Sequence, residues 1–521
     1  MENIESIFST EQNERFYAAD YADSDIYTES IGDYILPDYQ PEIRKILLVT
    51  SSLLPSGSYE SGGRATFGGS VRHHILYSDG EGALRAVELF SDYDYAFDAG
   101  EAAVSAALHT KECVTAVNCR LSGPRKLSIR TRILSHIYMI GKKSAECDTS
   151  GTKKEPECLT LRKSALSRRF VTAESELVCD VTLPFGEGDC SVLRADATLE
   201  VREVRADKGD IYLRGDAYVT LLMTGDDGEA LPLSAKMPFE EILNGGGIAP
   251  DATLLGYASC GSISVSIGEG EGGRVASVTL PLLLTAEILE TKETAFTVDA
   301  YSADAELCET YEKTCLPTLH FGGMGHFSVT ASARLSEMDA EDAASVLGAT
   351  VMPEDVTCRF DGNRATLCGN ARVRLLYAVP SDGEKMRYAS AEYAVPFRGE
   401  ITVAGEPMRY RVDGGFCDVR CRIDGDAFSV DAEYAFALTA ENDKEITWIR
   451  EIRDGAPIPS PEMAAIVVAY PEAGDSLWDV GKRYGVPLSL LGEVNRLDAR
   501  AVEAPASASS LDGVTRLVIV K

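Results

Sequence analysis

The chain has 521 residues and a formal net charge of −32, from 50 basic and 82 acidic residues. A surface this acidic repels phosphate backbones and anionic lipid headgroups, which argues against nucleic-acid binding; it serves solubility or attracts a basic partner. The sequence has no run of about 18 apolar residues, so we expect no direct membrane insertion. The N-terminus is acidic and lacks the basic and apolar regions of a signal peptide, so we expect a cytoplasmic protein.

Acidic residues dominate the N-terminal region, where several tyrosines are spaced irregularly among them. This composition predicts a flexible acidic arm over residues 1–34. The alternative is a tail that docks on a partner through Tyr17, Tyr21, Tyr27 and Tyr34.

Three stretches that begin with glycine share one pattern: Gly69–Tyr77, Gly215–Met223 and Gly369–Tyr377. Apolar residues recur at every second position of each stretch, which is the period of a strand with one buried face. The copies follow each other at a spacing of roughly 150 residues, which is too long for a solenoid unit. The pattern therefore predicts a mainly β chain with three tandem β-rich, sandwich-like domains, each with its own core.

These strands set the expected boundaries of the domains. We place the β-rich domains at residues 35–140, 176–300 and 301–453, with a linker at residues 141–175 that has no periodicity. Later strands of each domain are expected where β-branched and apolar residues alternate again.

Two short helices are expected to close the first and third β-rich domains. Pro41 can lie in the first turn of one helix. The second helix is expected at Asp339–Leu347. Glycine-rich stretches, among them Asn244–Gly247 and Gly322–Gly325, are expected to be turns. None of them follows a strand and opens a helix with Lys-Ser/Thr, as a phosphate-binding loop would.

Two adjacent histidines lie in the first repeated stretch. Because successive side chains of a strand point to opposite faces, His73 and His74 are not expected to bind one metal ion together. His73 stands where the other copies have Val219 and Val373. We therefore expect His73 in the core, where valine would be tolerated, and His74 in solvent.

The last part of the chain has a different character. A Pro-rich linker is expected at residues 454–465, and a small α+β domain at residues 466–521 with the order strand, helix, helix, strand (βααβ). Ser476 is placed as the N-cap of the first helix, with Asp479 as its capping-box partner. Gly485 is placed to end that helix.

Residues 466–521 resemble a LysM domain. The resemblance rests on Gly474–Leu477, on Lys482–Gly485 and on Asn495 after the second helix, although the usual Pro-Gly before the last strand is absent. In that family the ligand cleft lies between the loop before the first helix and the loop after the second. The resemblance implies a binding cleft formed by Gly474, Asp475, Ser476, Leu477, Trp478, Leu491 and Asn495.

Trp478 is one of only two tryptophans in the chain. Leu477, Val480 and Tyr484 occupy the apolar face of the first helix, and Trp478 lies about 100° round from Leu477. We expect Trp478 at the edge of that face, half-exposed, where it contacts a protein partner. The alternative is that Trp478 folds back over the core.

The β-rich part resembles the SPOCS domain of spore-associated proteins. Pro37–Ile43, Gly69–Tyr77 and Gly123–Arg130 carry the resemblance in the first copy, whereas the other copies keep the central strand alone. SPOCS repeats before a LysM domain are similar to spore morphogenetic proteins of the SipL type. That similarity implies a non-catalytic spore-coat scaffold in the mother-cell cytoplasm, at the forespore surface. It also implies that the LysM domain binds a coat morphogenetic ATPase resembling stage IV sporulation protein A.

Known signatures of catalysis and metal binding are missing from the sequence. It has no Gly-x-Ser-x-Gly elbow, no His-Glu-x-x-His, no Walker loop, and 13 cysteines without a Cys-x-x-Cys pair. The even spacing of Asp92, Asp94 and Asp98 could align their carboxylates as a site would need. An exposed strand edge explains these three acids as well. We expect no enzyme, no cofactor and no metal site. The alternative function is binding of peptidoglycan or another N-acetylglucosamine polymer through the LysM domain; a murein hydrolase would need a further catalytic domain.

Overall fold

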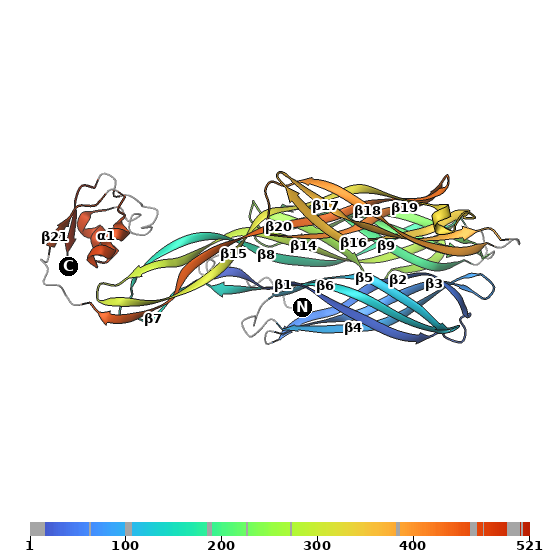
Figure 1. Cartoon of the computed structure of the whole chain (residues 1–521), viewed down its shortest axis with the longest axis horizontal. Coiled ribbons are helices and arrows are strands. Elements are labelled where there is room, and N and C mark those ends of the chain that lie inside the picture. Colours follow the sequence, from blue (N-terminus) through green and yellow to red (C-terminus); the bar gives the residue numbers. More distant parts are fainter. Residues whose placement is uncertain are drawn as a thin grey trace.

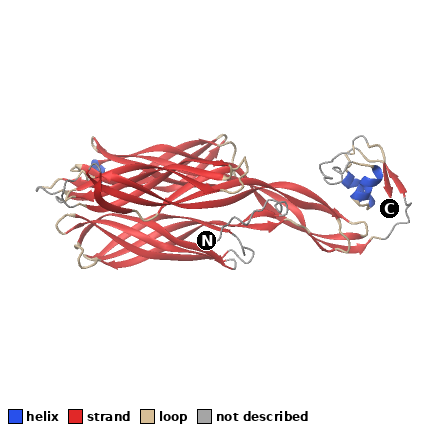
Figure 2. Ribbon diagram, turned by 180° about the vertical axis from the view of Figure 1, so that it is seen from behind, coloured by secondary structure: helices blue, strands red, loops and turns tan. Residues whose placement is uncertain are grey.

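The structure is a computed structural model that describes the chain in segments. The described residues are 16–61, 64–98, 107–184, 190–225, 228–270, 273–381, 386–458, 466–472, 474–497, 511 and 514–520. The molecule is mainly β, as the sequence predicts. It is elongated, with a wide body, a narrow stalk and a small helix-bearing domain at the end of the stalk (Figure 1; Figure 2).

Three β-sandwiches form the body, one for each copy of the repeated stretch. Repeat 1 contains β1 (Phe16–Ile35), β2 (Ile43–Ser61), β3 (Arg64–Asp79), β4 (Leu84–Asp98), β5 (Ala107–Gly123) and β6 (Lys126–Ser144). Repeat 2 contains β8 (Glu157–Thr182), β9 (Ser191–Asp207), β10 (Asp210–Thr224), β11 (Ala230–Asn244), β12 (Thr253–Cys260), β13 (Ser264–Gly270) and β14 (Gly273–Tyr301). Repeat 3 contains β15 (Ala305–Arg334), β16 (Ser345–Asp361), β17 (Arg364–Val379), β18 (Arg387–Thr402), β19 (Arg409–Asp424) and β20 (Ala427–Pro457).

The three repeats share one topology. One sheet of each is a meander, with the orders β2-β3-β4, β9-β10-β11 and β16-β17-β18. In the opposing sheet the last strand lies between the first strand and the strand that precedes it, as in β1-β6-β5 and β15-β20-β19. In repeat 2 the last strand is β14, which pairs with the first strand β8. On the other side of β14, two short strands, β12 and β13, take the place that β5 has in repeat 1. Because the first strand pairs with the last, each repeat closes on itself.

The repeated stretches lie in the central strands β3, β10 and β17, and their alternate side chains fill the cores, as predicted. None of these side chains is more than 4% exposed: Val71, His73, Ile75, Tyr77, Ala217, Val219, Leu221, Met223, Ala371, Val373, Leu375 and Tyr377. They pack against alternate side chains of the last strands, for example Ile129, Leu280 and Phe428. The period-two pattern therefore placed three strands and their buried faces correctly.

Leucines on the outer faces of the central strands meet where the repeats join. Leu76, Leu222 and Leu376 occupy equivalent positions on β3, β10 and β17, and all three are buried in one apolar cluster. The preceding strands add Leu47, Leu193 and Leu347 to the cluster. Each repeat thus contributes the same surface to a common contact, which gives the body an approximate three-fold arrangement.

A second contact between the repeats is charged. The carboxylate of Glu287 on β14 is fully buried and lies 2.8 Å from Arg168 Nε. It accepts hydrogen bonds from Arg411 Nη2 at 2.9 Å and from the Tyr257 hydroxyl at 2.7 Å. From repeat 1, Lys111 Nζ lies 3.6 Å from Glu287 and 3.1 Å from the centre of the Tyr257 ring. Side chains from all three repeats therefore meet at one buried carboxylate.

Burial and charge act on this junction in opposite directions. Burial lowers the pKa of Lys111 to about 8, although Asp413 and Glu287 favour its charged form. Burial would raise the pKa of Asp413, but Lys111 and Arg411 outweigh it and hold that pKa at about 2. Asp413 Oδ2 lies 2.8 Å from Arg411 Nε. The cluster is stable only as a complete set, because each buried charge depends on its neighbours.

The four longest strands run past the sandwiches and form the stalk. β8 pairs with β14 as far as Glu157 and Tyr301, and β15 pairs with β20 as far as Ala305 and Pro457. β7 (Asp148–Gly151) adds a short parallel strand to β20. The stalk interior contains Tyr17, Ala165, Phe296, Leu316, Ile446 and Trp448. The stalk is therefore a continuation of the sheets of repeats 2 and 3.

The flexible arm expected over residues 1–34 is wrong for its second half. Residues 16–35 form β1, whose backbone pairs with β6 along its length. Residues 1–15 lie outside the described residues. The acids of β1 face outward and alternate with inward-facing residues such as Ser30. The amino-acid composition of this half-buried strand is therefore the same as that expected of a flexible, solvated arm.

The linker expected at residues 141–175 is also wrong. It contains the end of β6, then β7 and the first part of β8, most of which belongs to the stalk. The repeats therefore run from β1 to β6, from β8 to β14 and from β15 to β20, instead of spanning residues 35–140, 176–300 and 301–453. β20 takes up the start of the expected linker at 454–465, and residues 459–465 lie outside the described residues.

Neither short helix forms where the sequence predicts it. β2 begins at Ile43, whose N–H donates to the carbonyl of Pro124 at 2.8 Å. In repeat 3, the 3₁₀ turn η4 (Leu335–Met338) comes before Asp339–Leu347, and β16 already begins at Ser345. Strand pairing takes up the backbone groups that a helix would bond internally.

Gly322–Gly325, expected as a turn, lies inside β15. A Cβ at Gly322 would lie 2.7 Å from Thr253 Cγ2 of β12. The glycine is needed because two strands approach closely here, not because the chain turns.

No helix in the described segments has the length and apolar character that crossing a bilayer requires. The same segments contain no group of three or more His, Cys, Asp or Glu side chains arranged to hold a metal ion. All 13 cysteines of the chain are described, and all are free thiols.

Leu222→Ala tests the apolar contact between the repeats. The substitution is expected to lower the free energy of unfolding by about 2–5 kcal/mol, because it leaves a cavity where three repeats meet. Urea unfolding followed by circular dichroism measures the change. Leu283→Ala, which truncates a β14 leucine that is 41% exposed, is the matched control and should have a much smaller effect. Equal effects of the two substitutions would contradict the assignment of this contact.

Candidate functional site

The C-terminal domain has the order that the sequence predicts. It contains β21 (Ile466–Ala469), α1 (Leu477–Tyr484), α2 (Leu488–Asn495) and β22 (Leu517–Val520). β21 and β22 pair antiparallel, and both helices share one core with the inner face of this sheet. The core includes Val480, Val486, Leu488, Leu517 and Ile519.

α1 begins and ends at the predicted residues. Ser476 Oγ accepts a hydrogen bond from the Asp479 N–H at 3.2 Å, and the Asp479 carboxylate accepts one from the Ser476 N–H at 2.9 Å. This is the expected capping box. Gly485 follows the helix with φ of +62°, a left-handed conformation that favours glycine.

Asp475 is held within the domain by an ion pair. Arg483 donates to its two carboxylate oxygens at 3.0 and 2.9 Å, and these hydrogen bonds lower the pKa of Asp475. The backbone carbonyl of Asp475 accepts a hydrogen bond from the Leu511 N–H at 3.2 Å. Gly474, with φ of +94°, allows the turn that leads into this arrangement. The predicted cleft loop is therefore fixed by its own bonds.

The remaining cleft residues on the helices also have structural roles. Leu477 and Leu491 are fully buried in the core. Asn495 ties the end of α2 to β22, since its Nδ2 donates to the Val518 carbonyl at 2.7 Å and its Oδ1 accepts from the Val518 N–H at 2.6 Å. The loop after α2, which would form the second wall of the cleft, lies outside the described residues.

Trp478 is not half-exposed, and the expectation that it lies open to a partner is wrong. Its side chain is only 3% exposed. The indole ring meets the Tyr301 ring edge to face at 5.0 Å between centres, and its Nε1 donates to Asp299 Oδ2 at 2.9 Å. Tyr301 and Asp299 belong to the end of β14, so Trp478 is covered by the stalk. Sequence reasoning confined to one domain could not detect a cover that another domain supplies.

Further contacts seat the small domain on the stalk tip. The Tyr301 hydroxyl donates to the Val486 carbonyl at 2.7 Å, and Lys482 Nζ pairs with Asp299 Oδ1 at 2.5 Å. A Cβ at Gly481 would lie 2.5 Å from the Tyr301 hydroxyl, so this position of α1 accepts only glycine without rearrangement. The α1 side of the domain is thus the side that faces the stalk.

Among the described residues of this domain, the exposed large apolar side chains lie on β21 and directly after it, outside the predicted cleft. Ile466 is 63% exposed, Val468 47% and Tyr470 72%. Val520 and Val518 pair with the first two residues across the sheet and are partly exposed. We call these five residues the β21 face. The sequence contains a signal for this face, because Ile466–Tyr470 is apolar at every position. A domain this small can cover only one face of the strand, so the other face is left exposed.

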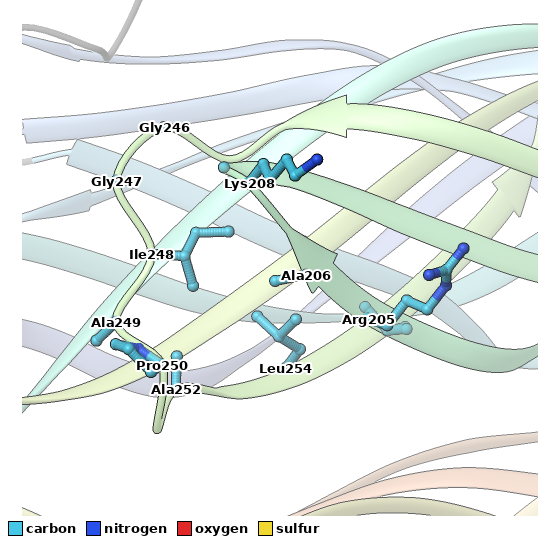
Figure 3. A pocket seen from close by; sticks show the side chains of 12 residues that line it. Arg205, Ala206, Lys208, Gly246, Gly247, Ile248, Ala249, Pro250, Ala252 and Leu254 are labelled. Atoms are coloured by element: carbon cyan, nitrogen blue, oxygen red, sulfur yellow. The ribbon is translucent and has the colours of Figure 1, made fainter.

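A pocket of about 870 Å³ opens beside the turn between β9 and β10 (Figure 3). Figure 3 shows Ile248 and Leu254 facing the same space, with the Lys208 amine turned away from Ile248. Arg169 fixes the surrounding loop, since its Nη2 donates to the Gly247 carbonyl at 2.8 Å. The lining has no carboxylate, histidine, serine or cysteine, so it offers no acid–base pair and no oxygen or sulfur nucleophile.

The contacts of the two histidines of β3 differ from expectation. His73 is buried, as predicted, but it joins a polar chain, with Nδ1 2.8 Å from Ser51 Oγ and Nε2 2.8 Å from Ser91 Oγ. His74 was expected in solvent, yet it is half-buried between repeats, and its Nε2 lies 2.8 Å from the Leu193 carbonyl oxygen. Comparison with Val219 could not reveal the serines that make a buried histidine acceptable.

Asp299→Ala tests the seating of the small domain. It leaves the indole N–H of Trp478 without its acceptor, which is expected to weaken the docked state by about 1–3 kcal/mol. In a Trp448→Phe background, the emission of Trp478 should shift to the red and acrylamide should quench it more strongly. Asp304→Ala, which removes a stalk ion pair with Lys154 at 2.8 Å, is the control. Unchanged quenching in Asp299→Ala would show that the contact does not hold the domain.

His73→Val tests the buried polar chain, and we now expect a loss of about 1–3 kcal/mol because two serines lose a partner. The pH dependence is a second readout. Burial lowers the pKa of His73 to about 4, whereas an unfolded histidine titrates near 6.5. Between about pH 6.5 and pH 4, His73 is protonated in the unfolded chain but stays neutral in the folded chain. Lowering the pH through this range therefore decreases the free energy of unfolding. This slope should be smaller in His73→Val, and an unchanged slope would contradict the assignment.

Comparisons with protein-family models, with curated proteins and with solved structures find no match to the chain. The proposal below therefore rests on the resemblances described in the sequence analysis and on the geometry of the chain's own residues.

Proposed function

We propose that the chain is a non-catalytic scaffold of the spore coat. The resemblance of the repeats to SPOCS domains and of the small domain to LysM supports this role. In this proposal the small domain binds a coat morphogenetic ATPase resembling stage IV sporulation protein A. The chain then acts in the mother-cell cytoplasm, at the forespore surface.

The observation that carries the proposal is the exposed β21 face. Three neighbouring side chains of β21 and its end, Ile466, Val468 and Tyr470, are each about half-exposed or more. Exposed apolar groups that lie together on a small domain are typical of protein interfaces, where tyrosine is enriched. The opposite side of the domain, with Trp478 and Lys482, faces the stalk. The seated domain therefore presents an apolar face outward.

The architecture of the rest of the chain supports a scaffold. The three repeats share an apolar contact and a charged junction, so the body has little freedom to flex between them. The stalk continues the sheets of repeats 2 and 3, and it carries the small domain away from the body (Figure 1). A partner bound at the β21 face would be held at a distance set by the stalk.

The alternative is a protein that binds N-acetylglucosamine polymers through the cleft loop. The side chains of that loop and of the first turn of α1 are engaged within the chain: Asp475 pairs with Arg483, Ser476 caps α1, and Trp478 on α1 is covered by Tyr301. A sugar would have to displace these contacts to use the same groups. These contacts favour the protein partner over the glycan.

Val468→Asp tests the proposed function. The substitution places a charge on the exposed face and is expected to raise the Kd for the purified coat ATPase by about tenfold or more, which corresponds to about 1.4 kcal/mol. Capture by the immobilised full chain measures binding, and circular dichroism checks folding. Val178→Asp changes a β8 valine that is 59% exposed in repeat 2, and it serves as the matched control. Unchanged capture by Val468→Asp, together with binding of chitin oligomers by the unaltered chain, would favour the glycan alternative.

A further inference from the structure

The pocket beside the β9–β10 turn lies at one end of repeat 2, between its two sheets. Its apolar lining comes from both sheets, with Val204 and Ala206 on β9 and Leu254 on β12. Ile248, from the loop between β11 and β12, faces the same space (Figure 3). The volume of about 870 Å³ is in the range of pockets that bind ligands. The pocket is therefore large enough to receive a side chain from outside the repeat.

Repeat 3 fills the corresponding place with its own aromatic rings. Ala206 and Phe360 are each the last residue but one of their strand, β9 and β16, before a hairpin turn of two residues. Phe360 packs against the core of repeat 3, and its ring centre lies 5.5 Å from that of Tyr410. The Tyr410 hydroxyl accepts a hydrogen bond from the Cys358 N–H at 3.2 Å, which fixes the second ring. This end of repeat 3 is therefore closed by a phenylalanine and a tyrosine.

Repeat 2 lacks both of these rings. Ala206 has a methyl group where Phe360 has a phenyl ring. When the pairing with the last strand is counted from the start of that strand, Gly256 of β12 corresponds to Tyr410. A Cβ at Gly256 would overlap the side chain of Val204, so β12 has no room for a ring at this position. The pocket is thus the place of an aromatic ring that repeat 2 does not supply.

The loop that forms one wall of the pocket is held by hydrogen bonds within the chain. Arg169 Nη2 donates to the Gly247 carbonyl at 2.8 Å, and the Ala249 N–H donates to Glu290 Oε1 at 2.9 Å. The Ala252 N–H donates to the Ala249 carbonyl at 3.0 Å. Since these bonds shape the wall, a ligand would not have to order the loop when it binds. Such preorganisation reduces the entropic cost of binding.

We propose that this pocket receives a phenylalanine or tyrosine side chain from an extended segment of a partner protein, in the place that Phe360 has in repeat 3. Both strands that line the pocket are edge strands in the described part of the chain, because β9 pairs only with β10 and β12 only with β14. An extended segment can bond to such an edge while its side chain enters the pocket, as Phe360 does from β16. The pocket lies in repeat 2, so its use does not depend on the proposed role of the β21 face.

The test uses the full chain and a short threonine peptide with one central 4-fluorophenylalanine, whose β-branched residues favour an extended backbone. A titration followed by fluorine NMR measures the Kd. Ala206→Phe supplies the ring from β9, as in repeat 3, and is expected to raise the Kd by about tenfold or more. Ala252→Leu narrows the pocket from another wall and should also raise the Kd, and circular dichroism checks that both variants are folded. Val178→Phe adds the same ring at an exposed position of β8 in repeat 2, and this matched control should leave the Kd unchanged.

Four results would overturn the proposal. An unchanged Kd in a folded Ala206→Phe or Ala252→Leu variant would show that the peptide binds outside the pocket. Equal competition by a peptide with leucine at the central position would show that the pocket does not select an aromatic ring. A Kd for 4-fluorobenzyl alcohol as low as that for the peptide would identify a small aromatic molecule as the occupant. Self-association of the unaltered chain in sedimentation, lost in Ala206→Phe, would identify the occupant as a second copy.

Discussion

The buried carboxylate of Glu287 is the constraint on which the arrangement of the body depends. Apolar contacts such as the leucine cluster tolerate many orientations, whereas a buried charge is stable only when its hydrogen bonds have good geometry. Arg168, Arg411 and Lys111 reach it from three repeats. Since Glu287 lies on β14, the strand that continues into the stalk, the same residue also ties the direction of the stalk to the body.

Much of the fold could be predicted from the sequence, where alternation was visible. The central strands had apolar residues at every second position, and their buried faces are as expected. The first strand β1 was missed because its outward positions hold acids and its inward positions include small polar residues such as Ser30. A half-buried strand of this kind differs from a solvated segment only through its partner strand, here β6, which lies about a hundred residues further along the chain.

The candidate site was harder to predict, for a different physical reason. Residues that define a small domain by its motif are often those that hold it together, as Asp475 and Asn495 do through their hydrogen bonds. Whether a residue such as Trp478 is open depends on surfaces that come from elsewhere in the chain, here Tyr301. The β21 face was more accessible to reasoning, because a strand that is apolar on both faces must expose one of them in so small a domain.

The continuity of β20 has a mechanical consequence. This one strand runs from the sheet of repeat 3 to the tip of the stalk, and it pairs with β15 from Arg334 to Ala305. A pull on the small domain, directed away from the body, acts along the axis of β20. The backbone hydrogen bonds to β15 would then share the load in parallel, as in a lap joint under shear, instead of opening one after another. A partner that moves relative to the body would drag the whole molecule with it before the strand could peel away.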